Sequence, residues 1–190
     1  MTRCTLKVFG LSTYLVATAM GLACSASASS PVDDDLRIFI DMHRCAIIER
    51  LEMIQMEPRV GPDPKNRYLI VSPVQHIGNY AQCIFFEDDS KMYCEAASGF
   101  FLTKPGQPNP TWLSPESRAA VVSLGYSLDD SKGNFAQKIT LSTETSLSSI
   151  AELLLTTLHR VYSARSYMRL ELKAPLAPRP RVVSPCRPTS

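Results

Sequence analysis

The sequence predicts an α+β fold in which one antiparallel sheet packs against helices. Two observations lead to this prediction. Apolar residues recur at helical spacing in some segments and alternate in others, which together give the element order α-β-β-β-α-β-α-β. The chain has 190 residues and, without an N-terminal signal, is the size of one domain with a single core. We therefore expect one α+β domain over residues 34–174.

The N-terminal 28 residues have the pattern of a secretory signal peptide. Two basic residues precede an apolar stretch over residues 8–23, and small residues follow it up to Ala28. We expect cleavage between Ala28 and Ser29, and a periplasmic or secreted protein without a stable membrane span. A retained membrane anchor is one alternative, and lipidation of Cys24 is another.

The charge of the chain excludes some classes of partner. The formal net charge is +2, and the two basic residues of the predicted signal account for it, so the remaining chain is neutral. A neutral domain lacks the basic surface that binds nucleic acid or an acidic membrane. We therefore expect neither as a partner.

The first helix is predicted over about residues 34–57. Apolar positions recur there at steps of three and four residues, acidic residues stand at the N-terminal end, and Pro58 ends the helix. Residues 29–33 are expected to be a flexible lead. The recurring positions that form one stripe along this helix are Leu36, Phe39, Ile40, His43, Ile47, Leu51 and Ile54.

Three strands are predicted next, near residues 67–74, 80–87 and 91–98. Each is a short run rich in aromatic and branched residues. The segments around them are rich in proline, glycine and acidic residues, which is typical of turns and connectors.

A short helix follows, and its ends are well marked. Ser114 is expected to be its N-cap, Pro115 occupies the first helical position and Gly125 lies just past the end. Residues 134–141 then alternate as a half-buried strand.

The C-terminal part of the domain is predicted to be a long amphipathic helix over about residues 143–163 and an edge strand over residues 166–174. Residues 175–190 contain five prolines and three arginines. We expect a disordered tail there, with a proline-rich docking peptide as the alternative.

Cys83 and Cys94 are predicted to face each other on adjacent strands. A turn centred on Asp88 and Asp89 places the two cysteines directly opposite each other, and the same register brings the two apolar rows of the hairpin together. Opposed residues lie within the Cα separation that a disulfide tolerates. In an oxidising compartment the pair is a structural disulfide, and the alternative is two free buried cysteines.

The other face of this hairpin is more apolar than a solvated surface. It carries Ile84, Phe86 and Tyr93, which we predict to bind a protein or peptide partner or a second copy of the chain. The alternative is that the long helices cover both faces of the sheet.

No motif for catalysis or for a cofactor is present in the sequence. His43 has the position of a core histidine, and neither His76 nor His159 forms a metal-ligand pair. There is no serine-nucleophile elbow and no glycine-rich phosphate loop. We expect no enzyme activity, no metal and no cofactor, and the pairing of Cys45 and Cys186 stays open.

Several segments of the second half resemble a known family. They are residues 83–101, Leu113-Ser114 with the helix after it, the turn Leu124-Gly125-Tyr126, the strand that begins at Asn134-Phe135, and the helix "AELLLTTLHRVY". Their order resembles the TY-Chap and YbjN-like families, which are similar in fold to type III secretion chaperones. The resemblance covers about residues 34–172 and implies a non-enzymatic protein-binding domain that is often dimeric.

The sequence thus predicts an exported, chaperone-like binding module without catalytic activity, which holds a partner segment or a second subunit on its sheet face. One alternative is a small secreted hydrolase in which His43 or His159 lies beside a serine or cysteine. Another is a structural component of the cell envelope that uses the tail as a tether.

Overall fold

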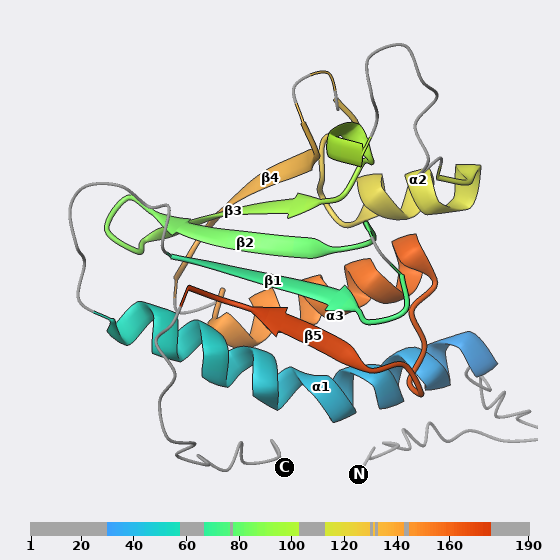
Figure 1. Cartoon of the computed structure of the whole chain (residues 1–190), viewed down its shortest axis with the longest axis horizontal. Helices are drawn as coiled ribbons and strands as arrows, with labels where there is room; N and C mark the ends of the chain where they lie inside the picture. Colours follow the sequence, from blue (N-terminus) through green and yellow to red (C-terminus); the bar gives the residue numbers. More distant parts are fainter. Residues whose placement is uncertain are drawn as a thin grey trace, which may run out of the picture.

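The computed structural model describes residues 30–57, 67–76, 78–102, 113–129, 131, 133–142 and 145–175. These residues form two layers, a five-stranded antiparallel sheet and a layer of helices (Figure 1). The α+β class and the order of helices and strands are those predicted, with one 3-10 turn added before α2. The predicted signal peptide, most of the connector after the first helix, and the predicted tail from residue 176 lie outside the described residues.

The sheet has the strand order β4-β3-β2-β1-β5, and each neighbouring pair is antiparallel. The C-terminal strand β5 therefore lies beside β1 at one edge, as the alternation of the sequence predicted for an edge strand. The bounds are β1 Tyr68–Pro73, β2 Ala81–Phe86, β3 Lys91–Ala96, β4 Phe135–Thr140 and β5 Leu170–Lys173.

Helix α1 spans Pro31–Met56 and begins earlier than predicted. Ser30 is its N-cap and accepts a hydrogen bond from the backbone N–H of Asp33, while Pro31 occupies the first turn. The expectation of a flexible lead over residues 29–33 is therefore wrong from Ser30 onward. Those residues form the cap and the first turn of the helix.

Helix α2 spans Pro115–Ser123 and has the predicted ends. The Ser114 hydroxyl accepts from the backbone N–H of Ser117 at 3.1 Å. Gly125 has φ +88°, and a Cβ at this position would lie 2.9 Å from Oε1 of Gln137. The positive φ therefore requires glycine here, whereas the flexible end of the Gln137 side chain could move away from a Cβ.

Helix α3 spans Leu147–Tyr162, with Ser146 as its N-cap. It starts about one turn later than the predicted residue 143, because Ser146 accepts from the backbone N–H of Ser149 and so sets the start of the helix. Its apolar stripe is the most deeply buried surface of the helix layer. The buried residues include Ile150, Leu154, Leu155, Leu158 and Val161.

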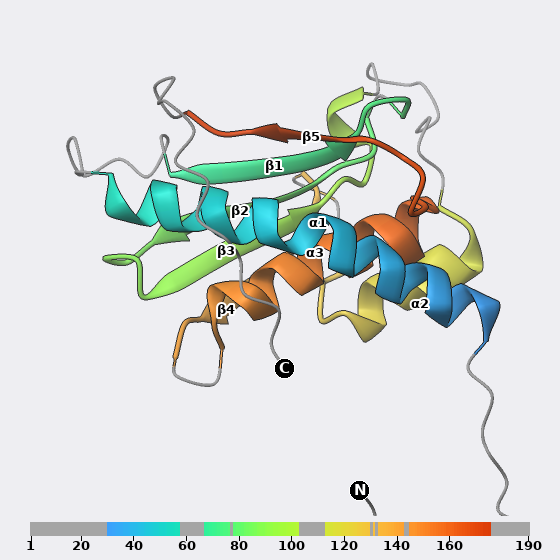
Figure 2. The same cartoon turned by 90° about the horizontal axis from the view of Figure 1, so that it is seen from below.

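The core lies between one face of the sheet and the helices. Figure 2 shows α1 and α3 side by side beneath the strands, with α2 at one end of α3. In β1, β2 and β3, the residues that point to the helices are buried and their neighbours on the opposite face are half-buried. At the edges of the sheet, the inward residues of β5 and most of those of β4 are only half-buried. In the part of the chain that the structure describes, helices cover one face of the sheet, so the alternative of helices on both faces is wrong there.

A buried cation ties α1 to the hairpin. Arg67 is 8% exposed, and its guanidinium donates to both carboxylate oxygens of Asp89, from Nε at 2.9 Å and from Nη2 at 2.5 Å. It also donates to the carbonyl oxygens of Gln55 and Glu57 at the C-terminal end of α1, at 3.2 and 3.0 Å. The planar guanidinium fork allows one side chain to hold both elements.

Candidate protein-binding surface on the open sheet face

The face of the sheet opposite the helices carries a band of aromatic and aliphatic side chains. Because side chains alternate along a strand, residues one position from the buried rows point to this face. Tyr68, Ile84 and Tyr93 are directly opposed on β1, β2 and β3, and Lys138 of β4 ends the row. The band therefore crosses four of the five strands.

The structure brings the three predicted residues together. Ile84 and Tyr93 are directly opposed, and Phe86 lies two residues along β2 from Ile84, opposite Lys91. All three side chains are half-buried. Burial, and then the nearby Glu95 carboxylate, raise the pKa of the Tyr93 hydroxyl, which therefore stays a neutral donor and acceptor at neutral pH.

Two residues of the band were not predicted. Tyr68 lies opposite Ile84, and Ile70 lies opposite Gln82 on the same face. The sequence placed both on a strand, but the connection between β1 and β2 is longer than a two-residue turn and does not fix the register. Alternation within β1 was the only available signal.

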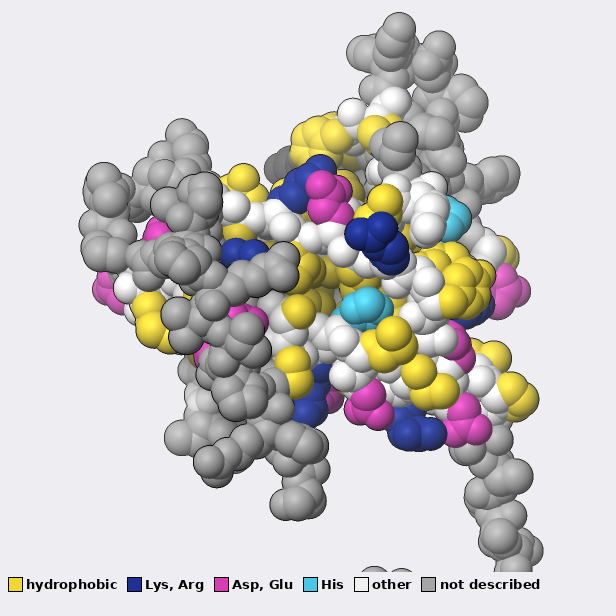
Figure 3. Space-filling view, turned by 60° about the horizontal axis from the view of Figure 1, so that its bottom comes forward, with side chains coloured by type: hydrophobic (Ala, Val, Ile, Leu, Met, Phe, Trp, Pro, Cys, Tyr) yellow, Lys and Arg dark blue, Asp and Glu magenta, His cyan; other side chains and the backbone are white. Residues whose placement is uncertain are grey.

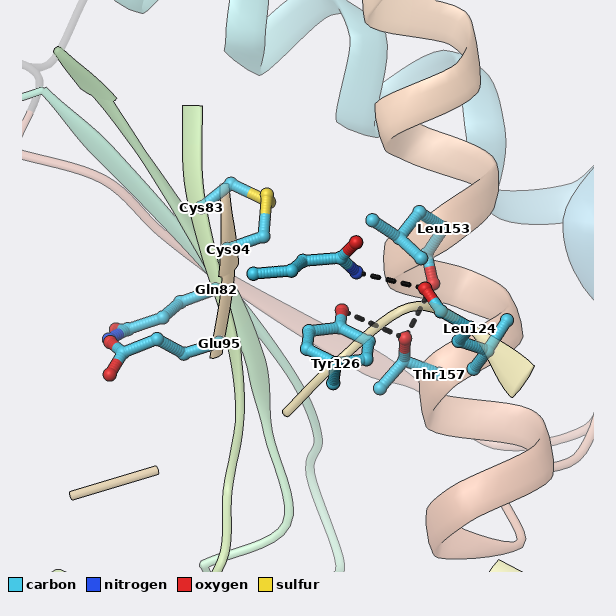
Figure 4. Close-up of a disulfide and its surroundings, with 9 residues drawn as sticks. Gln82, Cys83, Cys94, Glu95, Leu124, Tyr126, Leu153 and Thr157 are labelled. Atoms are coloured by element: carbon cyan, nitrogen blue, oxygen red, sulfur yellow. Dashed lines mark hydrogen bonds between the residues drawn. A yellow bond between two sulfur atoms is a disulfide. The ribbon is translucent and has the colours of Figure 1, made fainter. Parts of the chain in front are cut away.

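Polar residues frame the band. Gln82 donates a hydrogen bond to the Glu95 carboxylate across β2 and β3, and Lys91 pairs with Glu87 at the turn at 2.5 Å. In Figure 4 Gln82 and Glu95 point away from α3, on the side of the strands opposite Tyr126 and the helix. An apolar strip with a polar rim is the usual composition of a protein-binding surface.

A hollow of about 400 Å³ adjoins the band at the end of β1, β2 and β5. Ile70, Gln82 and Tyr80 line it, together with residues of the β1–β2 loop. The Tyr80 hydroxyl is fixed by a hydrogen bond from Nδ2 of Asn134 at 2.8 Å. The hollow is large enough to accept a side chain of a peptide that lies along the sheet.

The disulfide lies behind the band, on the helix side of the same two strands. The sulfur atoms of Cys83 and Cys94 are 2.07 Å apart, and both residues are fully buried. The two cysteines are directly opposed, and Glu87, Asp88 and Asp89 at the turn all have positive φ, which includes the two central positions of a type I′ hairpin turn. The predicted register and the predicted disulfide are confirmed.

The residues on which the suggested family resemblance rests form hydrogen bonds that join elements of the fold. Tyr126 donates to Thr157 Oγ1 at 3.1 Å, and Thr157 donates in turn to the Leu153 carbonyl at 2.7 Å, which ties the α2–β4 loop to α3 (Figure 4). Asn134 bridges Tyr80 and the backbone N–H of Ser98. These residues hold elements together at the ends of the sheet.

The buried histidine of α3 is bonded to a carboxylate. Nε2 of His159 lies 3.0 Å from Oδ2 of Asp35, and the Ser166 hydroxyl donates to Oδ1 of the same carboxylate at 2.6 Å. The serine therefore contacts the carboxylate, whereas a nucleophile activated by a histidine would contact the imidazole. The cluster ties α1 to α3 and to the loop before β5.

The two other histidines lie apart from this cluster. His43 contacts the ring of Phe39, with ring centroids 5.0 Å apart, and its Nε2 is buried without a hydrogen-bond partner. Burial lowers the pKa of its imidazole. His76 is exposed in the β1–β2 loop. Within the described ranges, no group of three or more His, Cys, Asp or Glu side chains could hold a metal ion.

Comparisons with protein-family models, with curated proteins and with solved structures found no match to this chain. The TY-Chap and YbjN-like assignment therefore stays a prediction. Among the described residues, no helix is both long enough and apolar enough to cross a membrane.

Proposed function

We propose that this chain is an exported, non-catalytic binding module that holds a protein or peptide partner, or a second copy of itself, on the open face of its sheet. One observation carries the proposal. The band lies on a helix-free face, next to a hollow that can receive a partner side chain; its residues are Tyr68, Ile70, Ile84, Phe86 and Tyr93. A soluble domain normally places more polar residues on such a face.

The disulfide supports the export part of the proposal. Disulfides persist in oxidising compartments and are rare where thiols are kept reduced. The Cys83–Cys94 bridge is therefore in keeping with the signal-like N-terminus. Export predicts that the protein recovered outside the cytoplasm begins at Ser29, which mass spectrometry of its N-terminus would test. A protein retained in the cytoplasm with its first 28 residues would contradict it.

The binding surface can be tested by crosslinking in cells that produce the protein. A photoreactive phenylalanine analogue at Tyr93 should give an adduct of discrete mass, and Ile84→Ala with Phe86→Ala should remove it, because the double variant deletes the apolar side chains beside the crosslinker. An adduct of twice the chain mass would identify a second copy as the partner.

Controls separate loss of binding from loss of folding. The double variant should keep a cooperative urea transition, since both side chains are only half-buried. Val122→Ala with Tyr167→Ala changes exposed apolar residues elsewhere and should leave the adduct intact. Absence of any adduct at Tyr93, or an adduct that survives in the folded double variant, would rule out this surface.

A further inference from the structure

Strand β5 lies at an edge of the sheet and has one open side. In the part of the chain that the structure describes, no strand pairs with that outer side. On the inner side, the carbonyl of Arg169 accepts from the N–H of Val74, and the same alternation continues along β5 in its register with β1. The backbone N–H and C=O groups of Leu170 and Leu172 therefore point away from β1, where they can pair with a further strand.

The opposite edge of the sheet is less open than β5. There, the backbone N–H of Ser127, in the loop between α2 and β4, donates to the carbonyl of Ala136 at 2.9 Å. The loop therefore closes part of the outer side of β4. Among the described residues, no such backbone bond reaches the outer side of β5. Of the two edges, β5 is the one that can accept an added strand.

A groove runs between this edge and α1. Leu170 and Leu172 point to the helix layer but are only half-buried, although Val71, which lies opposite Leu172 on β1, is fully buried. Figure 3, which brings the side of α1 and β5 forward, shows hydrophobic side chains and a histidine at the surface between charged ones. The two leucines line a hollow of about 270 Å³, to which α1 contributes His43, Ala46 and Ile47.

The position of α1 favours a single added strand over a second copy of the domain. Because α1 borders the hollow beside β5, a second copy that paired its own β5 here would bring its own α1 to the same place. An extended peptide has no helix layer and can occupy the groove by itself. Addition of a peptide strand to a sheet edge is a common mode of recognition, in which the backbone supplies affinity and alternate side chains supply specificity.

The charges along β5 indicate which peptide fits. Arg169, Glu171 and Lys173 are exposed and alternate with the leucines, so they lie toward the open face of the sheet. Directly opposed residues of antiparallel strands point to the same face, so an added strand meets these charges at every second position. Acidic residues opposite Arg169 and Lys173, and a basic residue opposite Glu171, complement them. The residues in between face the leucines and the hollow, which favours apolar side chains.

We propose that the edge of β5 binds an extended peptide as an additional antiparallel strand, in which acidic, apolar, basic, apolar and acidic residues follow one another. The backbone of the peptide pairs with Leu170 and Leu172, and its apolar side chains enter the groove beside α1. This site is separate from the band on the open face of the sheet, and the proposal does not depend on that band.

The test measures the binding of labelled synthetic peptides to the full chain by fluorescence anisotropy. The peptide Thr-Glu-Val-Lys-Val-Glu-Thr should bind, and Thr-Lys-Val-Glu-Val-Lys-Thr, which places like charges opposite β5, should bind about tenfold more weakly. Arg169→Glu combined with Glu171→Lys and Lys173→Glu should reverse this preference. No binding of the first peptide at concentrations up to about 1 mM, or a preference that the triple variant does not reverse, would overturn the proposal.

Methylation of peptide nitrogens tests the backbone pairing. In the antiparallel arrangement the N–H groups of the two valines bond to β5, whereas those of the charged residues point away from it. Methylating the two valine nitrogens should therefore weaken binding about tenfold, and methylating the nitrogen of the central lysine should leave it unchanged. Equal effects of the two modifications, or the reverse order, would overturn the added strand.

A variant of α1 tests whether the peptide lies in the groove. Ala46 is exposed and lines the hollow, so Ala46→Trp should fill the groove, keep a cooperative urea transition and weaken binding of the first peptide at least about tenfold. Val122→Trp adds the same ring at an exposed position of α2 and should leave binding unchanged. Binding that survives Ala46→Trp would overturn the site.

The same experiments separate this site from other occupants and from the open face. A dimer in which Leu172→Cys forms a disulfide between two copies would assign the edge to a second copy and overturn the peptide. Crosslinking at Tyr93 reports on the open face and the peptide titration on the edge, so failure of one counts against that surface alone.

Discussion

Arg67 illustrates how single residues join separate elements of this molecule. Its guanidinium is almost fully buried, holds the carboxylate of Asp89, donates to two carbonyls at the end of α1, and lies over the ring of Phe85 at 5.9 Å from its centroid. Removing the cation leaves the Asp89 carboxylate, whose side chain is 14% exposed, and two backbone acceptors without this donor. The cost of such a loss exceeds that of breaking any exposed ion pair.

Arg67→Met should therefore lower the free energy of unfolding by about 3 kcal/mol, measured by urea denaturation. Arg37→Met is the matched control, because Arg37 pairs with Asp34 and Asp41 at 3.9 Å on a surface where its side chain is 67% exposed. That variant should change stability by less than about 0.5 kcal/mol. Equal effects of the two variants would contradict the role of Arg67.

His159 should make stability depend on pH. Burial lowers the pKa of its imidazole from the ordinary 6.5, although hydrogen bonding to Asp35 acts in the opposite direction. Because a carboxylate only accepts, Nε2 carries the proton, and Nδ1 is buried without a partner, so protonation there would bury an unpaired donor. The unfolded chain binds a proton at higher pH than the folded chain, so stability is full above pH 6.5 and falls as the pH drops below it.

Urea denaturation at pH 7.5 and at pH 5.5 measures this loss. His159→Gln should reduce the difference between the two pH values, and the remainder should come from His43, whose pKa burial also lowers. His76→Gln changes an exposed loop residue and should keep the full difference. A His159→Gln protein with the same pH dependence as the parent would refute the assignment.

At the scale of elements, the hairpin β2–β3 was the best-predicted part. Its turn and the parity of its two apolar rows fixed the register, which local sequence can do when the loop has two residues. The first turn of α1 was missed, although Ser30-Pro31 is the same dipeptide as Ser114-Pro115. Ser146 was not predicted as the N-cap of α3, because several serines and threonines precede this helix and each has the side chain of an N-cap residue.

The hairpin disulfide should contribute measurably to stability. Cys83→Ala with Cys94→Ala should lower the free energy of unfolding by about 2–3 kcal/mol relative to the bridged protein, as the chain-entropy account predicts for so short a loop. The variant should have this lower stability under non-oxidised and oxidised conditions alike, because it cannot form the bridge. Lys91→Ala changes an exposed ion pair of the same hairpin and should cost less than about 1 kcal/mol. Unchanged stability in the double cysteine variant would show that the bridge contributes nothing.

At the scale of the whole molecule, the sheet has one face for the core and one for the surface. The sequence supplied three residues of the surface, because alternation within a strand assigns faces. It could not supply Tyr68 as the neighbour of Ile84 or Ile70 as the neighbour of Gln82. Nor could it supply the contact between Asp35 and His159, two residues that are separated by 124 positions. Contacts between distant segments depend on packing that no local pattern encodes.

The position of β5 also has a consequence for how the protein is made. Strand β5, the last that the structure describes, pairs with β1, the first, and the Ser166 hydroxyl just before β5 bonds to Asp35 near the start of α1. While the chain is being synthesised or translocated, β1 therefore has an unpaired edge, and the apolar side of α1 that faces Leu170 and Leu172 is open until the C-terminal residues emerge. Folding of this sheet can be completed only after synthesis has passed Lys173, and during that interval the nascent chain would depend on something else to cover that edge.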